Sequence, residues 1–231
     1  MYFGIDTEYL LLVLPALLLS IFAQIKVKSA YSRYSSVSNR RGLTGAEAAR
    51  AVLMQNGVSS VSIERVSGTL SDHYDPRSNV IRLSDGVYDS SSIAAVGIAA
   101  HEAGHAVQYA ENYIPVKFRT AIFPISKFGS SLAFPLFLFG LIFNYSFLLD
   151  LGIIFFFAAL AFQVVTLPVE FNASRRAMSA IKDGGLLSEQ EELSGARKVL
   201  SAAAMTYVAA VLVSLGQFLR FILIAGRRGR R

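Results

Sequence analysis

The stretch from Phe128 to Val169 limits the possible folds of this chain most strongly. It contains 42 residues and a single charged one, Asp150. About 20 consecutive apolar residues cross a bilayer as a helix, and irregular backbone is not tolerated in lipid. The stretch therefore predicts two transmembrane helices joined by a tight turn near Asn144 to Asp150. Pro135 is expected to kink the first helix.

Two further runs are long enough to cross a membrane. Tyr9 to Ile25 is uncharged and, together with the mostly apolar Met1 to Ile5, predicts a slightly short span. A cleaved signal peptide is a weaker interpretation, because the acidic Asp6 and Glu8 precede the run where a signal would be basic. Val199 to Leu219 is uncharged and rich in Ala and Ser, which suits close helix packing in lipid. We therefore expect about four transmembrane helices.

Composition supports membrane residence and limits the chemistry. The chain has 231 residues, of which 53% are hydrophobic and 16% are charged, whereas soluble domains carry about a quarter charged residues. It has no cysteine, which excludes disulfides, thiolate metal sites and cysteine nucleophiles, so a metal must take nitrogen and oxygen ligands. The net charge of +6 suits contact with anionic lipid, and no arginine-aromatic pattern indicates nucleic acid. Nothing in the sequence indicates an oligomeric state.

Basic residues predict the orientation in the cell membrane. The segment after the first span carries Lys26, Lys28, Arg33, Arg40 and Arg41, which places it in the cytoplasm and the N-terminus outside. With four spans the C-terminus also lies outside, together with a second basic group formed by Arg227, Arg228, Arg230 and Arg231. This placement conflicts with the positive-inside rule. We expect the basic residues after the first span to determine the orientation. The alternatives are a last helix that does not cross and an inverted orientation.

The polar segment from 26 to about 120 is expected to form a small α+β domain. Thr44 and Glu47 form a capping box that opens a helix to about Gln55, with Gly57 as its stop. Patterns typical of strands follow at Val61–Val66, Leu70–Tyr74 and Val80–Leu83. Asp89 or one of the serines at 90, 91 and 92 is expected to cap the next helix.

That next helix, Ile93 to Glu111, contains the sequence His101-Glu102-Ala103-Gly104-His105, an HExxH motif. Residues four apart lie on one helix face, so both histidines can bind the same metal ion. Glu102 lies beside that ion and can serve as a general base. The alternative is a buried helix whose histidines form hydrogen bonds and bind no metal. Two of the three histidines in the chain lie in this motif, which favours metal binding.

A catalytic zinc site needs a third protein ligand. Glu111 holds the third-ligand position of the metzincin pattern, but Gln108 replaces the required glycine, and a continuing helix turns Glu111 away from His105. His73 and Glu170 remain. His73 is more often a surface or strand-edge residue, and Glu170 begins a polar helix after an apolar span, where it could simply favour the helix N-terminus. Position alone leaves both candidates open.

The whole pattern resembles the YugP-type family of bacterial membrane zinc metallopeptidases. The resemblance covers nearly the whole chain and rests on the N-terminal span, HEAGHAVQ, the apolar hairpin and PVEFNASRRA. The segment Asp72–Pro76 followed by Val80–Leu83 also resembles the strand before HExxH in the HtpX and CAAX prenyl protease families.

In those families the third ligand is the first Glu of an E-x-x-A-D-R-type helix, which the resemblance places at Glu170, with Ala173 and Arg175 in register. Ser174 replaces the aspartate of that pattern. An aspartate at such a position would orient a histidine ligand, so Asn172 or Asp72 is considered as its substitute.

The resulting hypothesis is an integral membrane, mainly α protein with a small α+β gluzincin-like metallopeptidase domain. It divides into a transmembrane helix (1–25), a cytoplasmic α+β domain (26–120), a transmembrane hairpin (121–169), a polar helix and loop with the third ligand (170–198), and a last span with a basic tail (199–231). One Zn²⁺ per chain, held by His101, His105 and Glu170, with Glu102 as base, would hydrolyse peptide bonds of membrane or membrane-proximal proteins.

Substrate backbone is expected to pair with the strand around Leu70 to Tyr74, where His73 or Tyr74 could also stabilise an oxyanion. The alternative functions are a non-enzymatic zinc-binding membrane scaffold, which has no use for Glu102, and a transporter, which four spans with a large polar insert fit poorly.

Overall fold

The computed structural model describes residues 6–228 and is mainly helical. Its internal contacts divide the chain into two units, described separately below. The first, here the helical unit, contains Met1–Ala23, Lys117–Leu167 and Thr206–Arg231. The second, here the α/β unit, contains Gln24–Val116 and Pro168–Met205. Several long helices contribute residues to both units.

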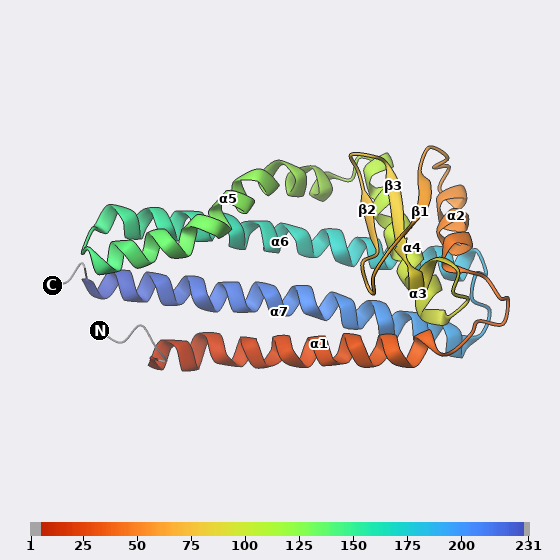
Figure 1. Ribbon diagram of the computed structural model, residues 1–231, viewed down its shortest axis with the longest axis horizontal. Coiled ribbons are helices and arrows are strands. Elements are labelled where there is room, and N and C mark those ends of the chain that lie inside the picture. Colours follow the sequence, from red (N-terminus) through yellow and green to blue (C-terminus); the bar gives the residue numbers. More distant parts are fainter. Residues whose placement is uncertain (1–5, 229–231) are drawn as a thin grey trace. The chain divides into compact units, whose positions relative to one another are not determined.

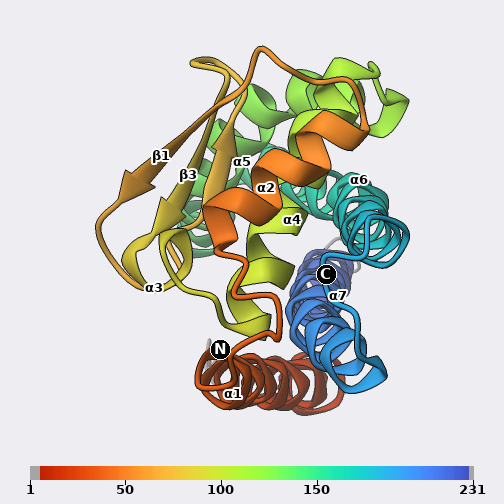
Figure 2. The same cartoon turned by 90° about the vertical axis from the view of Figure 1, so that its right-hand side faces the viewer.

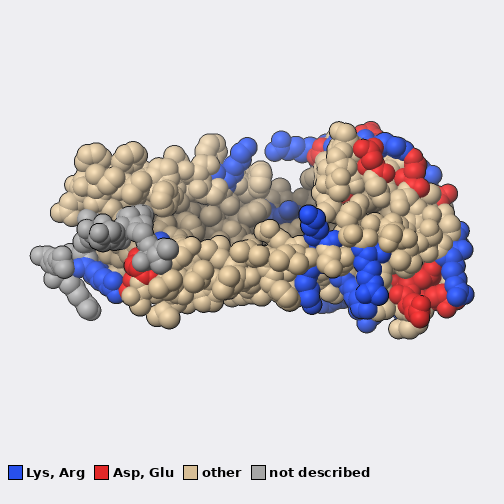
Figure 3. Space-filling view, turned by 60° about the horizontal axis from the view of Figure 1, so that its bottom comes forward, with Lys and Arg blue, Asp and Glu red and all other residues tan. Residues whose placement is uncertain are grey.

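Within residues 6–228, four helices are long and apolar enough to cross a membrane, which agrees with the expected number. They are α1 (Leu14–Ser35, preceded by a π-helical turn η1 at Tyr9–Val13), α5 (Ile114–Ile142), α6 (Ser146–Asp183) and α7 (Gln190–Arg228). Figure 3 shows an extended uncharged surface along these helices, as lipid contact requires. Met1 to Ile5 of the predicted first span, and Arg230 and Arg231 of the basic tail, lie outside the described residues.

Aromatic packing joins the helices within the helical unit. Phe137 of α5 is fully buried and stacks on Phe221 of α7, with ring centroids 4.0 Å apart. Phe156 of α6 meets the same Phe221 ring edge-on at 5.1 Å. Figure 1 shows that α5 bends along its length, and this helix contains Pro124 as well as the predicted Pro135. Each proline removes one backbone donor and so favours bending.

The hairpin turn is tighter and earlier than expected. α5 ends at Ile142 and α6 begins at Ser146, so Asp150 lies inside α6 and not in the turn. Asn144 provides the reversal with a left-handed backbone (φ 53°), a conformation that asparagine adopts more readily than most residues.

Both later helices are longer than the apolar runs within them. We expected a new polar helix to begin at Glu170, but α6 runs unbroken from Ser146 to Asp183 with Pro168 inside it. A helix-end role for Glu170 is therefore wrong. α7 likewise begins at Gln190, before the predicted start at Val199. Apolar composition marks the part of a helix suited to lipid, whereas the helix itself continues wherever caps and breakers permit.

The α/β unit has a three-stranded sheet with the order β1-β3-β2. Strand β1 (Ser62–Val66) pairs parallel with β3 (Val80–Ser84), and β2 (His73–Asp75) pairs antiparallel with the other edge of β3. Its helices are α2 (Gly45–Gln55), the short α3 (Asp85–Tyr88) and α4 (Ile93–Ala110). Figure 2 shows α4 between the sheet and α6. This position makes α4 the centre of the core of the unit.

The predicted helix boundaries here are largely correct. Thr44 caps α2 and exchanges hydrogen bonds with Glu47 in a capping box, and Gly57 follows α2 with a left-handed backbone (φ 68°). Ser92, one of four candidates, caps α4 through the amide of Ala95. The second strand is displaced from the prediction: Leu70 has a left-handed backbone (φ 55°), and pairing begins only at His73.

Two ion pairs join residues that precede η1 to the last part of α7 in the helical unit. Arg220, whose side chain is only 7% exposed, contacts Asp6 at 2.9 Å, and Arg227 pairs with Glu8. Arg227 belongs to the C-terminal basic group named above, whereas Arg220 does not. The positive-inside rule counts Lys and Arg rather than net charge, so the conflict noted above stands.

Candidate metal centre

Helix α4 positions the two histidines of the motif one turn apart. Its first half is rich in alanine, a strong helix former, and Ala99, Ala100 and Ala103 are completely buried. The face that carries His101 and His105 is the face that α6 covers. The two rings lie with centroids 4.7 Å apart at an interplanar angle of 83°, and both side chains are nearly buried (14% and 12% exposed).

Glu170 of α6 completes a cluster of three potential ligands. Its Oε2 lies 3.4 Å from Nε2 of His101 and 3.4 Å from Nε2 of His105, and its side chain is only 4% exposed. Ligand atoms of the three residues all lie within 4.8 Å of one another. The structure thus brings together the three residues predicted to bind zinc, and all three belong to the α/β unit.

A chain of hydrogen bonds holds the ring of His105. Its Nδ1 lies 3.0 Å from Oε1 of Gln108, and Nε2 of Gln108 donates to the carbonyl of Val169 and to Oδ1 of Asn172. Because both of those partners only accept, the amide orientation of Gln108 is fixed with Oε1 toward His105. Oε1 also only accepts, so Nδ1 of His105 carries the proton. In the neutral ring this leaves the lone pair on Nε2, which faces Glu170.

The chain of hydrogen bonds continues to the surface. Nε of Arg176 donates to Oδ1 of Asn172, and its Nη2 donates to Oε2 of Glu111 at 2.6 Å. Glu111, rejected above as a ligand, is therefore the outer end of the support for His105. Its carboxylate is not part of the cluster.

His101 is supported by Ser174, the residue that replaces the family aspartate. Oγ of Ser174 lies 3.2 Å from Nδ1 of His101. Asp72 does not serve as the substitute, because its carboxylate accepts from the amide and hydroxyl of Ser84 at the end of β3. Asn172 acts on His105 through Gln108 and not on a histidine directly.

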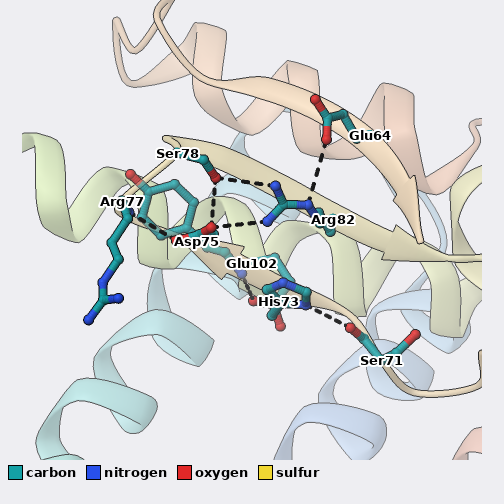
Figure 4. A network of polar contacts seen from close by, with 9 residues as sticks. Glu64, Ser71, His73, Asp75, Arg77, Ser78, Arg82 and Glu102 are labelled. Atoms are coloured by element: carbon teal, nitrogen blue, oxygen red, sulfur yellow. Dashed lines mark hydrogen bonds and ion pairs between the residues drawn. The ribbon is translucent and has the colours of Figure 1, made fainter. Parts of the chain in front are cut away.

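Glu102 is held by the edge of the sheet. The backbone amide of Tyr74 in β2 donates to Oε2 of Glu102 at 3.0 Å. Figure 4 shows Glu102 beside His73 of the same strand. Strand β2 uses its other edge to pair with β3, so this amide belongs to the free edge of the sheet. Glu102 is half-buried and lies next to His101 in the sequence.

His73 is exposed, and its Nδ1 contacts the carbonyl of Ser71. It does not belong to the three-residue cluster, so its strand-edge interpretation is the correct one. The hydroxyl of Tyr74 donates to Oδ1 of Asn79, and burial, followed by the nearby Tyr109, raises the pKa of this phenol. Both side chains that we considered for stabilising an oxyanion therefore have hydrogen-bond partners of their own.

The cluster fits a divalent transition-metal ion. Two imidazole nitrogens and one carboxylate oxygen form a donor set that catalytic zinc sites use, with a further position left for water. Burial lowers the pKa of His105, but the contact with Glu170 and the charge of Glu102 outweigh it, so this pKa lies above its ordinary value. The surroundings therefore favour positive charge at the centre of the cluster, as a metal ion would supply.

The chain belongs to the family described as "Putative neutral zinc metallopeptidase", whose model matches residues 9–226. The similarity to one curated relative is also extensive. The "Putative membrane protease YugP" of Bacillus subtilis (strain 168) is 51% identical over 216 residues, which cover 94% of this chain and 96% of that protein. No solved structure matches the chain. The family implies zinc and supports a protease-like function.

Sequence reasoning missed the support that Gln108 gives to His105. Gln108 follows His105 by three residues, and this spacing places both on one helix face, so the signal was present. We interpreted Gln108 only as the residue that breaks the metzincin pattern. Its partners Val169 and Asn172 lie more than 60 residues away, and nothing local in the sequence indicates them.

Proposed function

We propose that this protein is a membrane-bound zinc metalloendopeptidase that hydrolyses peptide bonds of membrane or membrane-proximal proteins. The observation that carries the proposal is the convergence of His101, His105 and Glu170 within 4.8 Å in a chain of a zinc metallopeptidase family. Glu102 adds the group that hydrolysis needs beyond metal binding.

In this mechanism His101, His105 and Glu170 would hold one zinc ion. Zinc would act there as a Lewis acid, polarising the scissile carbonyl and making water a nucleophile near neutral pH. Glu102 accepts the proton of the attacking water and transfers it to the leaving amine. The amide of Tyr74 keeps the carboxylate of Glu102 in place beside the cluster. Gln108 and Ser174 keep the histidine rings oriented.

The substrate in this proposal is an extended polypeptide that pairs with the free edge of β2. An unpaired strand edge forms hydrogen bonds with the backbone of a peptide, so binding depends little on the peptide sequence. The amide of Tyr74 on this edge already donates to Glu102, so a peptide paired beside it would lie next to the base. The preceding strand residues, 70–72, lie outside β2, so we limit the pairing edge to His73–Asp75.

We place the protein in the cell membrane as a multi-pass protein with the α/β unit on the cytoplasmic side. Four apolar helices support membrane residence, and the basic residues that follow the first span support the side. A reporter fused after Arg231 tests the orientation, since an even number of spans returns the C-terminus to the side of the N-terminus.

Substitution of Glu102 by Gln tests the proposed function directly. Full-length protein in detergent should bind about one zinc per chain, measured by elemental mass spectrometry, and should degrade casein. Glu102→Gln should keep the zinc and lose proteolysis. Glu64→Gln, on the exposed face of β1, is the matched control and should retain both. Normal cleavage by Glu102→Gln would refute the assignment of the base.

A second pair of variants tests the third ligand. Glu170→Gln should lower zinc affinity strongly, whereas His73→Gln should leave it unchanged. Full zinc affinity in Glu170→Gln would refute the proposed ligand set. Wild-type protein that holds zinc but cleaves no polypeptide would favour the alternative, a zinc-binding membrane scaffold.

A further inference from the structure

Helices α1 and α7 form a groove on the α/β unit with a volume of about 540 Å³. It is separate from the zinc cluster, since none of the cluster residues lines it. Four of its lining residues are basic, Lys26 and Arg33 from α1 and Arg197 and Lys198 from α7.

The basic residues lie on two facing helical stripes. On α1 the lining residues Lys26, Ser29 and Arg33 follow one another at intervals of three and four, which places them on one face. On α7 the stripe runs from Ser194 through Arg197 and Lys198 to Ser201. Each helix therefore contributes both cations and hydroxyl groups to the same groove.

Three basic side chains of the groove have no acidic partner in the described part of the chain. No Asp or Glu is among its lining residues. Within residues 6–228, Arg33, Arg197 and Lys198 form no ion pair with a carboxylate, and all three are exposed. The observed partner of Arg33 is the ring of the adjacent Tyr34, at 5.7 Å. An anion would therefore complete the contacts of these three basic side chains.

The groove changes character along its length. At one end of the groove Tyr34 packs against Gly195. From this contact the two helices continue side by side with antiparallel chain directions (Figure 1). Ile25, Ala202 and Met205 therefore line the other end. That apolar end coincides with the point where both helices enter their uncharged runs, Tyr9 to Ile25 and Val199 to Leu219. Basic and apolar linings in this order match a headgroup and the start of its acyl chains.

We propose that this groove binds the phosphate-bearing headgroup of an anionic phospholipid. Arginine provides forked donors that match phosphate oxygens, and lysine adds a compact charge. Basic pockets between membrane helices are known headgroup sites. The apolar end distinguishes a lipid from free phosphate, which would gain nothing from Ile25 or Met205. The inference does not depend on the proposed peptidase activity.

Native mass spectrometry of the full chain released from mixed nanodiscs tests the proposal. Equal amounts of phosphatidylglycerol and phosphatidylcholine should yield protein that retains phosphatidylglycerol preferentially. Combined substitution of Arg33, Arg197 and Lys198 by Gln should reduce the retained phosphatidylglycerol by roughly tenfold or more. The matched control is Lys28→Gln with Arg50→Gln and Arg77→Gln, which removes the same charge from exposed positions outside the groove. This control should retain lipid as the wild type does.

Three results would overturn the proposal. The first is retention of both lipids in the proportion supplied. The second is equal loss of phosphatidylglycerol in the groove variant and the control, since a general charge effect would then explain the binding. The third is displacement of the retained lipid by inorganic phosphate as effectively as by added phosphatidylglycerol, which would assign the groove to a soluble anion.

Discussion

Gly104 of α4 packs directly against the backbone of Ala173 in α6. A Cβ atom added at Gly104 would lie 2.8 Å from the carbonyl oxygen of Ala173, which is closer than such atoms approach one another. Ala173 is itself completely buried. Gly104 precedes His105, and Ala173 lies one helical turn after Glu170. The close approach of these two residues therefore sets the distance across which the ligands of α4 and α6 meet.

Gly104→Ala is expected to lower zinc affinity and stability together. The added methyl must push α6 from α4, and overpacking of this kind typically costs roughly 1–3 kcal/mol. Gly97→Ala on the same helix is the matched control, because its Cβ would lie 3.6 Å from the nearest atom, an ordinary contact. Thermal unfolding and zinc titration of both variants make the comparison. Equal behaviour of the two would refute the role of the Gly104–Ala173 contact.

Gln108→Met is expected to weaken zinc binding by roughly 10–100-fold, since loss of a ligand's outer hydrogen bond has effects of this size. Methionine has a similar volume but cannot hold Nδ1 of His105 or donate to Val169 and Asn172. Glu111→Gln should have a much smaller effect, because Arg176 still donates to Asn172. Competition with a chelator of known affinity gives the measurement. Unchanged affinity in Gln108→Met would show that the ring of His105 is oriented by other contacts.

The parts of this site that follow a local pattern were predictable. The helical spacing of His101 and His105 fixes their common face, and the capping box at Thr44 fixes the start of α2. Length and hydropathy were enough to predict four spans. These features depend on neighbours in the sequence, which a single sequence displays.

The parts that depend on distant contacts were not predictable. Helix α6 continues through Pro168 and carries Glu170 in its interior, although the change from apolar to polar residues suggested a new helix there. The contact of Ser174 with His101 joins residues 73 positions apart. Glu170 itself was reached by resemblance to a family pattern, since position alone left His73 open.

Asp75 is expected to stabilise the strand β2 in a pH-dependent way. The hydroxyl of Ser78, the amide of Arg77 and the guanidinium of Arg82 hold the pKa of Asp75 well below its usual range (Figure 4). A carboxyl whose folded pKa is depressed stabilises above its unfolded pKa, about 4, and loses this effect as pH falls toward the folded pKa. Asp75→Asn should therefore melt below the wild type at pH 7.

The difference between Asp75→Asn and the wild type should shrink as the pH falls below about 4, because the wild type then loses its ionised carboxylate. Thermal unfolding midpoints of both proteins across this range give the measurement. A difference that stays constant from pH 7 to pH 3 would mean that the charge of Asp75 contributes nothing to stability.

The ion pair between Arg220 and Asp6 is expected to hold the segment that precedes η1 against α7. Nε of Arg220 lies 3.2 Å from both carboxylate oxygens of Asp6, and its guanidinium lies over the ring of Tyr9 at 5.3 Å. Arg220→Leu leaves the partly buried carboxylate without this cation and should destabilise the protein by about 2 kcal/mol, less than for a fully buried pair. Asp6→Asn combined with Arg220→Leu removes both charges and should recover part of the loss.

Arg227→Leu is the control, because its side chain is 68% exposed and exposed pairs contribute little. If thermal unfolding in detergent shows the same loss for Arg220→Leu and Arg227→Leu, burial of the Asp6 pair gives it no special role in joining the two helices.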